Sequence, residues 1–192
     1  LMPNAGCAVG GARGGRFLVL QHEPAPRTPR RAAQQSRHTM SFVHLRTHTE
    51  YSVVDGTLRV DDAVSAAARD GQAACAITDL SNLFGAIKFY TAARKKGVKP
   101  VIGCDLWLEP EGNDKHGSRL LVLVQNHQGY LNLCELLARA WSGNTQRAQA
   151  FVKWEWFETH GGGLLVLSGA DGGAVGQALL AGDVERAESL AL

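Results

Sequence analysis

From Met40 onward, short apolar runs alternate with segments whose apolar residues recur at helical spacing. The runs are short and nearly free of polar positions, as in strands that are buried on both faces. They predict strands at 42–43, 73–78, 100–103 (continued or doubled by 105–108), 119–124 and 164–167. The helical spacing predicts helices at 60–69, 84–96, 129–141, 154–160, 174–180 and 183–192. A polar turn, expected to be a hairpin tip, is predicted at 109–118, and a polar connector at 142–150.

This order of elements favours an α/β fold with a parallel sheet or barrel. The pattern stops inside a helical segment at the end of the chain, with no closing strand after it. We therefore expect an incomplete (β/α) barrel rather than a closed one.

Residues 1–39 follow a different pattern. They hold four of the six prolines and a Gly/Arg-rich run at 10–16, and they show no sustained periodicity, so we expect disorder there. The chain begins with Leu1, whereas Met40 directly precedes the first predicted strand. We interpret 1–39 as a disordered extension or translated upstream sequence, and 40–192 as a partial domain. An Arg-rich, acid-poor transit peptide is the alternative.

Charge is distributed as unevenly as the prolines. Residues 1–39 contain six Arg and one Glu, which leaves 14 basic and 17 acidic residues in 40–192. The folded part is therefore mildly acidic and offers no global basic field for nucleic acid. We interpret the run Arg94-Lys95-Lys96 as a solvated face that complements a helix dipole.

The four cysteines, at 7, 75, 104 and 134, form neither a CxxC pair nor a zinc-knuckle spacing. Cys75 and Cys134 lie in apolar runs, and we expect both to be small buried core residues. Free cysteines of this kind suit a reducing compartment, so a cytoplasmic location is predicted. No uncharged apolar run approaches the roughly 18 residues that a membrane-spanning helix needs.

Polar residues follow the predicted strands, at the edge where functional groups of parallel α/β folds gather. His44, His48 and Asp55 follow the first strand, Asp79 the second and Asp105 lies near the third. We expect them to converge, with Asn126-His127 after the next strand. Imidazoles and carboxylates together would suit a divalent metal cluster that acts on phosphate.

Each of these residues also has a simpler interpretation. Asp79 could cap the helix that starts near Leu83, and Asp55 before Gly56 is a turn signature. Asp105 could be an ordinary strand-end carboxylate, and His127 a solvated loop residue. The glycines of 169–176 match no phosphate-binding loop, so a plain turn and helix start is predicted there. Arg46 argues against a metal, because a guanidinium keeps its proton and repels a cation.

Several longer segments resemble a known family. HLRTHTEYSVVDG, AITDLSNLFGAIKFYTAARKKGVKPVIGCDL and VLVQNHQGYLNLCELLARAW are similar, in order and spacing, to the amino-terminal polymerase-and-histidinol-phosphatase (PHP) domain of bacterial DNA polymerase III alpha subunits. LLVLSGADGGAVGQALLAGD fits the same domain. The resemblance covers Met40 to the end of the chain and supports Met40 as the natural start. It implies a distorted α/β barrel with metal ligands at the strand ends.

The chain departs from the metal-competent pattern of that family at three places. The first His-x-His motif is Arg46-x-His48 here, and Leu80 stands where a His follows the Asp of the TD motif. Asp105, one methylene shorter, replaces a Glu after Gly103-Cys104.

The resemblance thus implies a degraded metal site. Its remnant ligands would be His48, Asp55, Asp79 and Asp105, and Arg46 and Leu80 would be the substitutions that vacate it. We expect the Arg46 guanidinium to fill the vacated metal position and to pair with Asp55 or Asp79.

The function implied is that of an amino-terminal fragment of a replicative DNA polymerase, whose palm and Mg²⁺ ions lie elsewhere in the full-length protein. The PHP piece would be structural and would dock a proofreading exonuclease rather than catalyse. Its partners would be the polymerase core of the same chain, that exonuclease subunit and, through the full-length protein, DNA. The alternative is an independent PHP-type phosphoesterase or 3'-5' exonuclease, which would need Mn or Zn.

Overall fold

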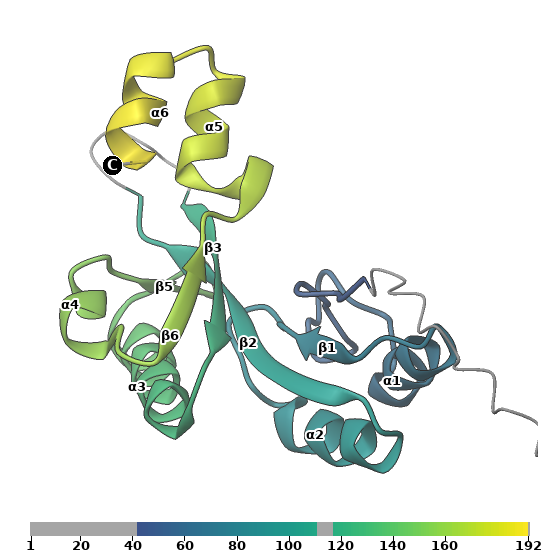
Figure 1. Ribbon diagram of the computed structural model, residues 1–192. Helices are drawn as coiled ribbons and strands as arrows, with labels where there is room; N and C mark the ends of the chain where they lie inside the picture. Colours follow the sequence, from purple (N-terminus) through teal and green to yellow (C-terminus); the bar gives the residue numbers. More distant parts are fainter. Residues whose placement is uncertain (1–41, 111–116, 192) are drawn as a thin grey trace, which may run out of the picture. The chain divides into compact units, whose positions relative to one another are not determined.

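The computed structural model describes residues 42–110 and 117–191 (Figure 1). The disorder expected for 1–39 and most of the polar turn expected at 109–118 lie outside the described residues. The described helices are α1 (Val60–Arg69), α2 (Ala86–Lys95), α3 (His127–Gly143), α4 (Trp156–His160), α5 (Ala174–Leu180) and α6 (Val184–Ala191), with a 3₁₀ turn η1 (Ala170–Gly172). The strands are β1 (Ala74–Ile77), β2 (Lys99–Leu108), β3 (Ser118–Val124), β4 (Thr145–Gln146), β5 (Gln149–Val152) and β6 (Leu164–Leu167).

The strands form a mixed sheet built around the long strand β2, which confirms the α/β class and the open, half-barrel form. Strand β1 pairs with β2 in parallel through 99–102, and β5 pairs in parallel farther along, at 107–108. On its other edge, β2 pairs with β3 antiparallel, and β3 pairs with β6 antiparallel. The expectation of a parallel sheet is therefore wrong for β3 and β6, which run antiparallel to their neighbours. The nine residues between the end of β2 and the start of β3 are too few for a crossover helix, which agrees with the hairpin tip expected there.

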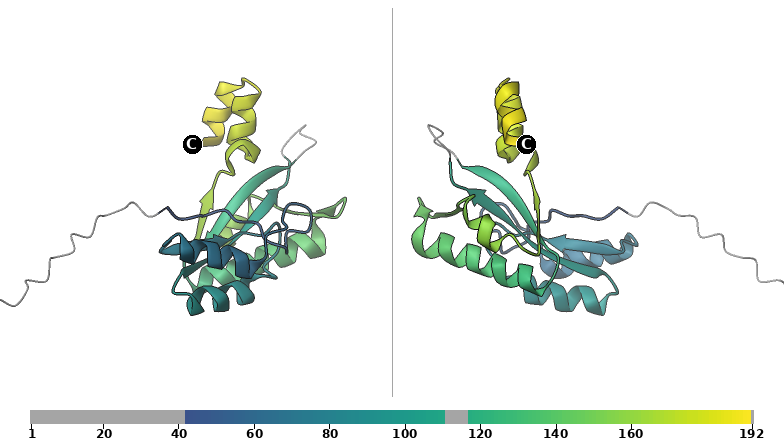
Figure 2. Two further views of the ribbon diagram at one scale, coloured as in Figure 1. Left: turned by 90° about the vertical axis from the view of Figure 1, so that its right-hand side faces the viewer. Right: turned by 60° about the vertical axis from the view of Figure 1, so that its left-hand side comes forward.

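Two hydrophobic cores lie along β2. The first joins α1 and α2 to β1 through residues such as Val64, Ile77 and Phe89. The second joins α3 to β2, β3 and β5 through residues such as Leu106 and Leu133. Both cores use even-numbered residues of β2, and Figure 2 shows the helices and strands from two further sides.

Residues of β2 with odd numbers face away from these cores, because side chains alternate along a strand. Asp105 and Trp107 thus lie on the sheet face opposite to the second core, where Arg119 of β3 pairs in register with Trp107. Gly103 stands where the pairing of β2 passes from β1 to β3, and an added Cβ there would contact the carbonyl oxygen of Val122. The alternation therefore decides which residues can form a site.

Most predicted elements are present, but two segments differ. The segment 42–49 is not a strand, although its carbonyls at His44 and Thr47 accept hydrogen bonds from β1 and from the residue after it. The polar connector at 142–150 contains β4 and the start of β5, whose side chains point to solvent except near Ala150. The strands were predicted from continuous apolar runs, and the exposed residues of β4 and the start of β5 form no such run.

The cysteines of the described part are free. Cys75 and Cys104 are buried, whereas Cys134 is half-buried, so the expectation of a buried core residue is confirmed for Cys75 alone of the two predicted. Within 42–110 and 117–191, no helix has the length and apolar character required to cross a membrane.

Candidate functional site

The site is built on the loop that runs from His44 to Gly56 beside the end of β1. The Ala76 amide donates to His44 and the Thr78 amide to Thr47, which holds the loop along the strand. The loop then turns back on itself, with the Gly56 amide donating to the carbonyl of Ser52 at 2.7 Å. A Cβ on Gly56 would collide with the carbonyl oxygen of Thr49, so this turn needs a glycine.

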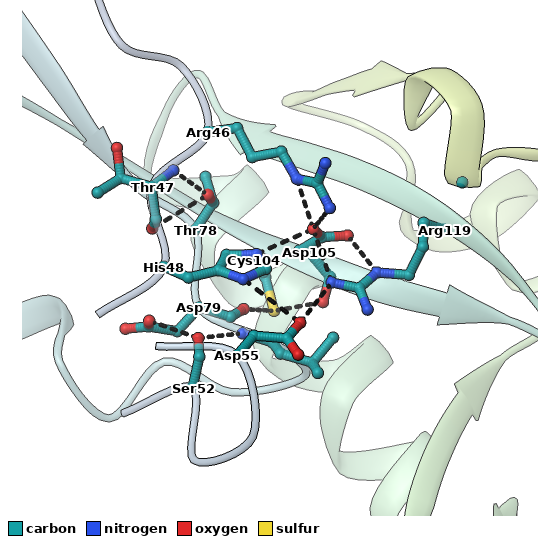
Figure 3. A network of polar contacts seen from close by, with 12 residues as sticks. Arg46, Thr47, His48, Ser52, Asp55, Thr78, Asp79, Cys104, Asp105 and Arg119 are labelled. Atoms are coloured by element: carbon teal, nitrogen blue, oxygen red, sulfur yellow. Dashed lines mark hydrogen bonds and ion pairs between the residues drawn. The ribbon is translucent and has the colours of Figure 1, made fainter. Parts of the chain in front are cut away.

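Asp105 is the centre of the site and is 1% exposed. Arg46 contacts its Oδ2 with Nε at 2.8 Å and Nη2 at 2.7 Å (Figure 3). His48 Nε2 lies 3.0 Å from the same oxygen and must carry its hydrogen there, because an ionised carboxylate only accepts. The carboxylate is thus held by groups from a loop that is more than fifty residues away in sequence.

Arg119, from β3, makes a bidentate contact with the carboxylate of Asp105. Its Nε donates to Oδ1 at 3.1 Å and its Nη2 donates to Oδ2 at 3.0 Å. The same Nη2 lies 3.4 Å from Asp55 Oδ2, and the guanidinium carbon lies 4.6 Å from the centre of the Trp107 ring. With an 11% exposed side chain, Arg119 is better shielded from solvent than Arg46, which is 45% exposed.

We call Arg46, His48, Asp55, Asp105 and Arg119 the Asp105 cluster. It contains two carboxylates and two guanidinium groups, so its formal charges cancel when the imidazole is neutral. Burial alone would raise the pKa of Asp105, but hydrogen bonds from the imidazole and from Arg119, with the charge of Arg119, hold that pKa well below its ordinary value. Asp105 therefore stays ionised although it is buried.

Asp79 forms a second centre beside this cluster. Its Oδ1 accepts from the Thr49 amide at 2.6 Å and from the Ser52 hydroxyl at 2.7 Å, and its Oδ2 accepts from the Thr49 hydroxyl at 2.8 Å. Asp79, Thr49 and Ser52 are all buried. The interpretation of Asp79 as a helix cap is wrong, because its carboxylate oxygens bind the loop instead of the start of α2.

Two further residues lie next to Asp79. The Leu80 amide donates to Ser52 Oγ at 3.0 Å, and Leu80 forms an isolated parallel bridge with Asp105. Cys104 is fully buried with its sulfur 3.1 Å from the Asp79 carbonyl, and burial raises the pKa of that thiol far above its ordinary value. Cys104 therefore remains a neutral packing residue.

The structure brings together His48, Asp55 and Asp105, with Asp79 beside them, but not every predicted residue joins. His44 is exposed and makes an edge-to-face contact with Phe42, with ring centroids 4.8 Å apart. Asn126 caps α3 by accepting from the Gly129 amide, and His127 is exposed at the start of that helix, as its simpler interpretation predicted.

Arg46 meets a different carboxylate from the one expected. We predicted a pair with Asp55 or Asp79, but the guanidinium binds Asp105. The reason is that Thr49 and Ser52 already bind the oxygens of Asp79, while Asp55 pairs with Arg119 and His48.

Arg119 is the site residue that the sequence analysis missed. A single arginine at the start of an apolar strand gives no periodic signal. The pairing of β2 with β3 in the structure explains why Arg119 belongs to the site, because in that register Arg119 is a diagonal cross-strand neighbour of Asp105.

The donors present do not fit a metal ion at Asp105. Oxygen Oδ2 already accepts from two guanidinium groups and one imidazole, and Oδ1 accepts from Arg119. A cation placed there would face two permanent positive charges at contact distance. In the part of the chain that the structure describes, no group of three or more His, Cys, Asp and Glu side chains is arranged to hold a metal ion.

Comparison with known proteins assigns the fold and this loop to a family. The family model described as the PHP domain matches residues 44–192, which include every residue of the two centres. The chain belongs to the PHP domain family. Three residues of the Asp105 cluster, His48, Asp55 and Asp105, are among those that the sequence analysis named as remnant metal ligands.

The relatives of this PHP domain include DNA polymerase III alpha subunits, whose amino-terminal region it resembles. The subunit from Pseudomonas aeruginosa is 43% identical over 152 residues, which cover 79% of this chain and 13% of that protein. The subunit from Escherichia coli K12 is 38% identical over 142 residues, covering 74% of this chain and 12% of that protein. The chain thus spans about an eighth of the length of the curated relatives it matches.

Among solved structures, an amidohydrolase from Chromobacterium violaceum with bound SO4 and no metal is similar to this PHP domain. The two share 21% identity with a TM-score of 0.43 over 53% of this chain and 34% of the other.

Proposed function

We propose that this chain is the amino-terminal part of a replicative DNA polymerase alpha subunit in which the PHP domain is structural rather than catalytic. The observation that carries the proposal is the saturation of Asp105 by Arg46, His48 and Arg119. A carboxylate that is fully engaged by internal cations cannot also ligate a metal or accept a proton from substrate. The chemistry of this centre is therefore that of a cross-link between loop and strands.

The structural role has a clear physical basis. The Asp105 cluster joins the loop at 46–55 to β2 and β3, while Asp79 joins the same loop to the end of β1. Each contact spans between 14 and 64 residues of sequence. We propose that the centre replaces the constraint that metal ions would supply and fixes the domain as a platform for the polymerase core and a proofreading exonuclease, in the cytoplasm.

The competing function is that of an independent PHP phosphoesterase or 3'-5' exonuclease. Its support is the convergence of His48, Asp55 and Asp105, with Asp79 adjacent. Against it stand Arg46, Arg119 and Leu80, none of which can ligate a metal.

Metal content separates the two functions. The purified chain is loaded with excess Mn²⁺ or Zn²⁺, desalted and assayed for bound metal and for hydrolysis of p-nitrophenyl phosphate. We expect substoichiometric metal, no activity above buffer, and an unfolding midpoint unchanged by a chelator. Stoichiometric metal with activity that is lost in His48→Ala would overturn the structural proposal.

The docking role is tested separately, by pull-down with a proofreading exonuclease subunit from a bacterium whose polymerase is similar. Retention of the exonuclease by this chain, and not by a chain unfolded beforehand in urea, is the expected result.

A further inference from the structure

The outer side of α2 carries large apolar side chains that are exposed to solvent. Phe84 is 78% exposed, Ile87 78% and Tyr90 51%. Ile87 and Tyr90 are three residues apart in α2 and therefore lie along one side of the helix with Arg94, and Phe84 lies in the turn directly before the helix. We call these four residues the α2 stripe; the opposite side of the helix is buried in the first core.

Exposed cations continue the α2 stripe at the carboxyl ends of α1 and α2. The parallel pairing of Ala74 with Lys99 and the shared core of the two helices bring these ends together. We call the cluster the basic end; it consists of Arg69, Arg94, Lys95, Lys96 and Lys99. Its members form no ion pair with any residue in 42–110 or 117–191, and the neighbouring acid, Asp70, accepts from Gln72.

Favourable interaction with the helix dipoles explains the positions of only some cations of the basic end. Arg69, Arg94 and Lys95 lie in last turns, where a cation is stabilising. Lys96 and Lys99 lie beyond the end of α2, and a dipole does not explain the apolar stripe. Since 40–192 carries only 14 basic residues against 17 acidic ones, the five cations gathered here form a local positive patch on an acidic domain.

We propose that the α2 stripe and the basic end together bind single-stranded nucleic acid without sequence preference. Aromatic rings beside a positive groove or face are the combination that binds unpaired strands, because bases stack on the rings while cations neutralise phosphates. Phe84 and Tyr90 supply the rings. From Ala86 to Arg94 the helical part of the face is about 12 Å long at 1.5 Å per residue, and with Phe84 before it the face is long enough for a few nucleotides. Duplex DNA, whose bases are already stacked, can use only the cations.

This binding face is distinct from the Asp105 cluster and does not depend on the structural role proposed for it. The test measures fluorescence anisotropy of a labelled dT oligonucleotide with the 192-residue chain over a range of salt concentrations. The charge variant is Lys95→Glu with Lys96→Glu, and the stacking variant is Tyr90→Ala. We expect the charge variant to bind at least tenfold more weakly and its salt slope to fall by about 1.4, since each lost phosphate contact contributes about 0.7. The stacking variant is expected to lose about fivefold with an unchanged salt slope.

A matched control changes the same charge elsewhere. Arg147→Glu with Lys153→Glu lowers the net charge equally; Arg147 lies in the turn between β4 and β5, and Lys153 directly follows β5. Like the charge variant, this control leaves the six arginines of 1–39 untouched. Equal losses in the control and the charge variant would overturn the proposal, because attraction would then be global. Tighter binding of duplex than of the dT strand, or of polyglutamate than of either, would also overturn it. Circular dichroism melting of each variant shows that it is folded.

Discussion

Asp105 shares one oxygen between two arginines that differ in their exposure to solvent. Arg119 is 11% exposed and binds both carboxylate oxygens, whereas Arg46 is 45% exposed and binds one. A pair that is shielded from water is weakened less by screening, but it costs more when one partner is removed. The two arginines should therefore contribute unequally.

Replacing each arginine by methionine measures this difference. We expect Arg119→Met to lower the free energy of unfolding by about 2–3 kcal/mol, because it leaves a buried carboxylate with one guanidinium and an imidazole. Arg46→Met should cost less than about 1 kcal/mol. Urea unfolding monitored by circular dichroism gives both values, and a larger loss for Arg46→Met would contradict the assignment of Arg119 as the main counter-charge.

The depressed pKa of Asp105 also predicts how stability depends on pH. The unfolded chain binds a proton at this carboxyl near its ordinary pKa of about 4, whereas the folded chain resists protonation. The stabilisation by Asp105 is therefore fully present above about pH 5 and is lost progressively as the pH falls below that. The difference in free energy of unfolding between the chain and Asp105→Asn should shrink from pH 6 to pH 3; a difference independent of pH would refute this.

At the scale of the elements, polar contacts hold the loop at 44–56 to β1 and to the residues after it. Ser52 Oγ donates to Asp79 and accepts from the Leu80 amide, so one hydroxyl joins the loop to the segment after β1. Deleting this buried hydroxyl removes the acceptor of the Leu80 amide and leaves Asp79 Oδ1 with the Thr49 amide as its donor.

We expect Ser52→Ala to destabilise the chain by about 1–3 kcal/mol and to speed hydrogen exchange at the Leu80 amide. Exchange followed by NMR provides the measurement. Ser142→Ala, on an exposed residue at the end of α3, is the control and should leave that amide unchanged.

The sequence predicted the elements whose signal is local. Periodicity located α1 to within a residue, and strand-end logic selected Asp79 and Asp105, since both depend on spacing along a few residues. The polar turn at 109–118 indicated a hairpin, but the role of Arg119 depends on the register in which β2 and β3 pair, which no local pattern encodes. The partner of Arg46 was predicted wrongly for a similar reason. The hydroxyls of Thr49 and Ser52 bind the carboxylate of Asp79, and the sequence does not show that these side chains meet.

At the scale of the whole molecule, the Asp105 cluster decides what would turn this PHP domain into a metal protein. Changing Arg46→His and Leu80→His together supplies two imidazoles but leaves the Arg119 fork on Asp105 and its contact with Asp55. A third change, Arg119→His, removes that permanent charge.

We expect the triple variant to bind Zn²⁺ or Mn²⁺ and the double variant to bind at least tenfold less, since a guanidinium within contact distance opposes a cation. Metal analysis after equilibrium dialysis measures both. Equal metal content in the two variants would show that Arg119 does not obstruct the site, and thermal unfolding checks that each variant remains folded.

The shared oxygen of Asp105 also has an evolutionary consequence. A single change of Arg46 to His would replace one cation by an imidazole, but it would leave the permanent charge of Arg119 on the same carboxylate. A metal site at Asp105 would therefore need at least two substitutions, and the first of them alone would bring no bound metal on which selection could act. The second arginine would in this way hinder a stepwise return to metal chemistry.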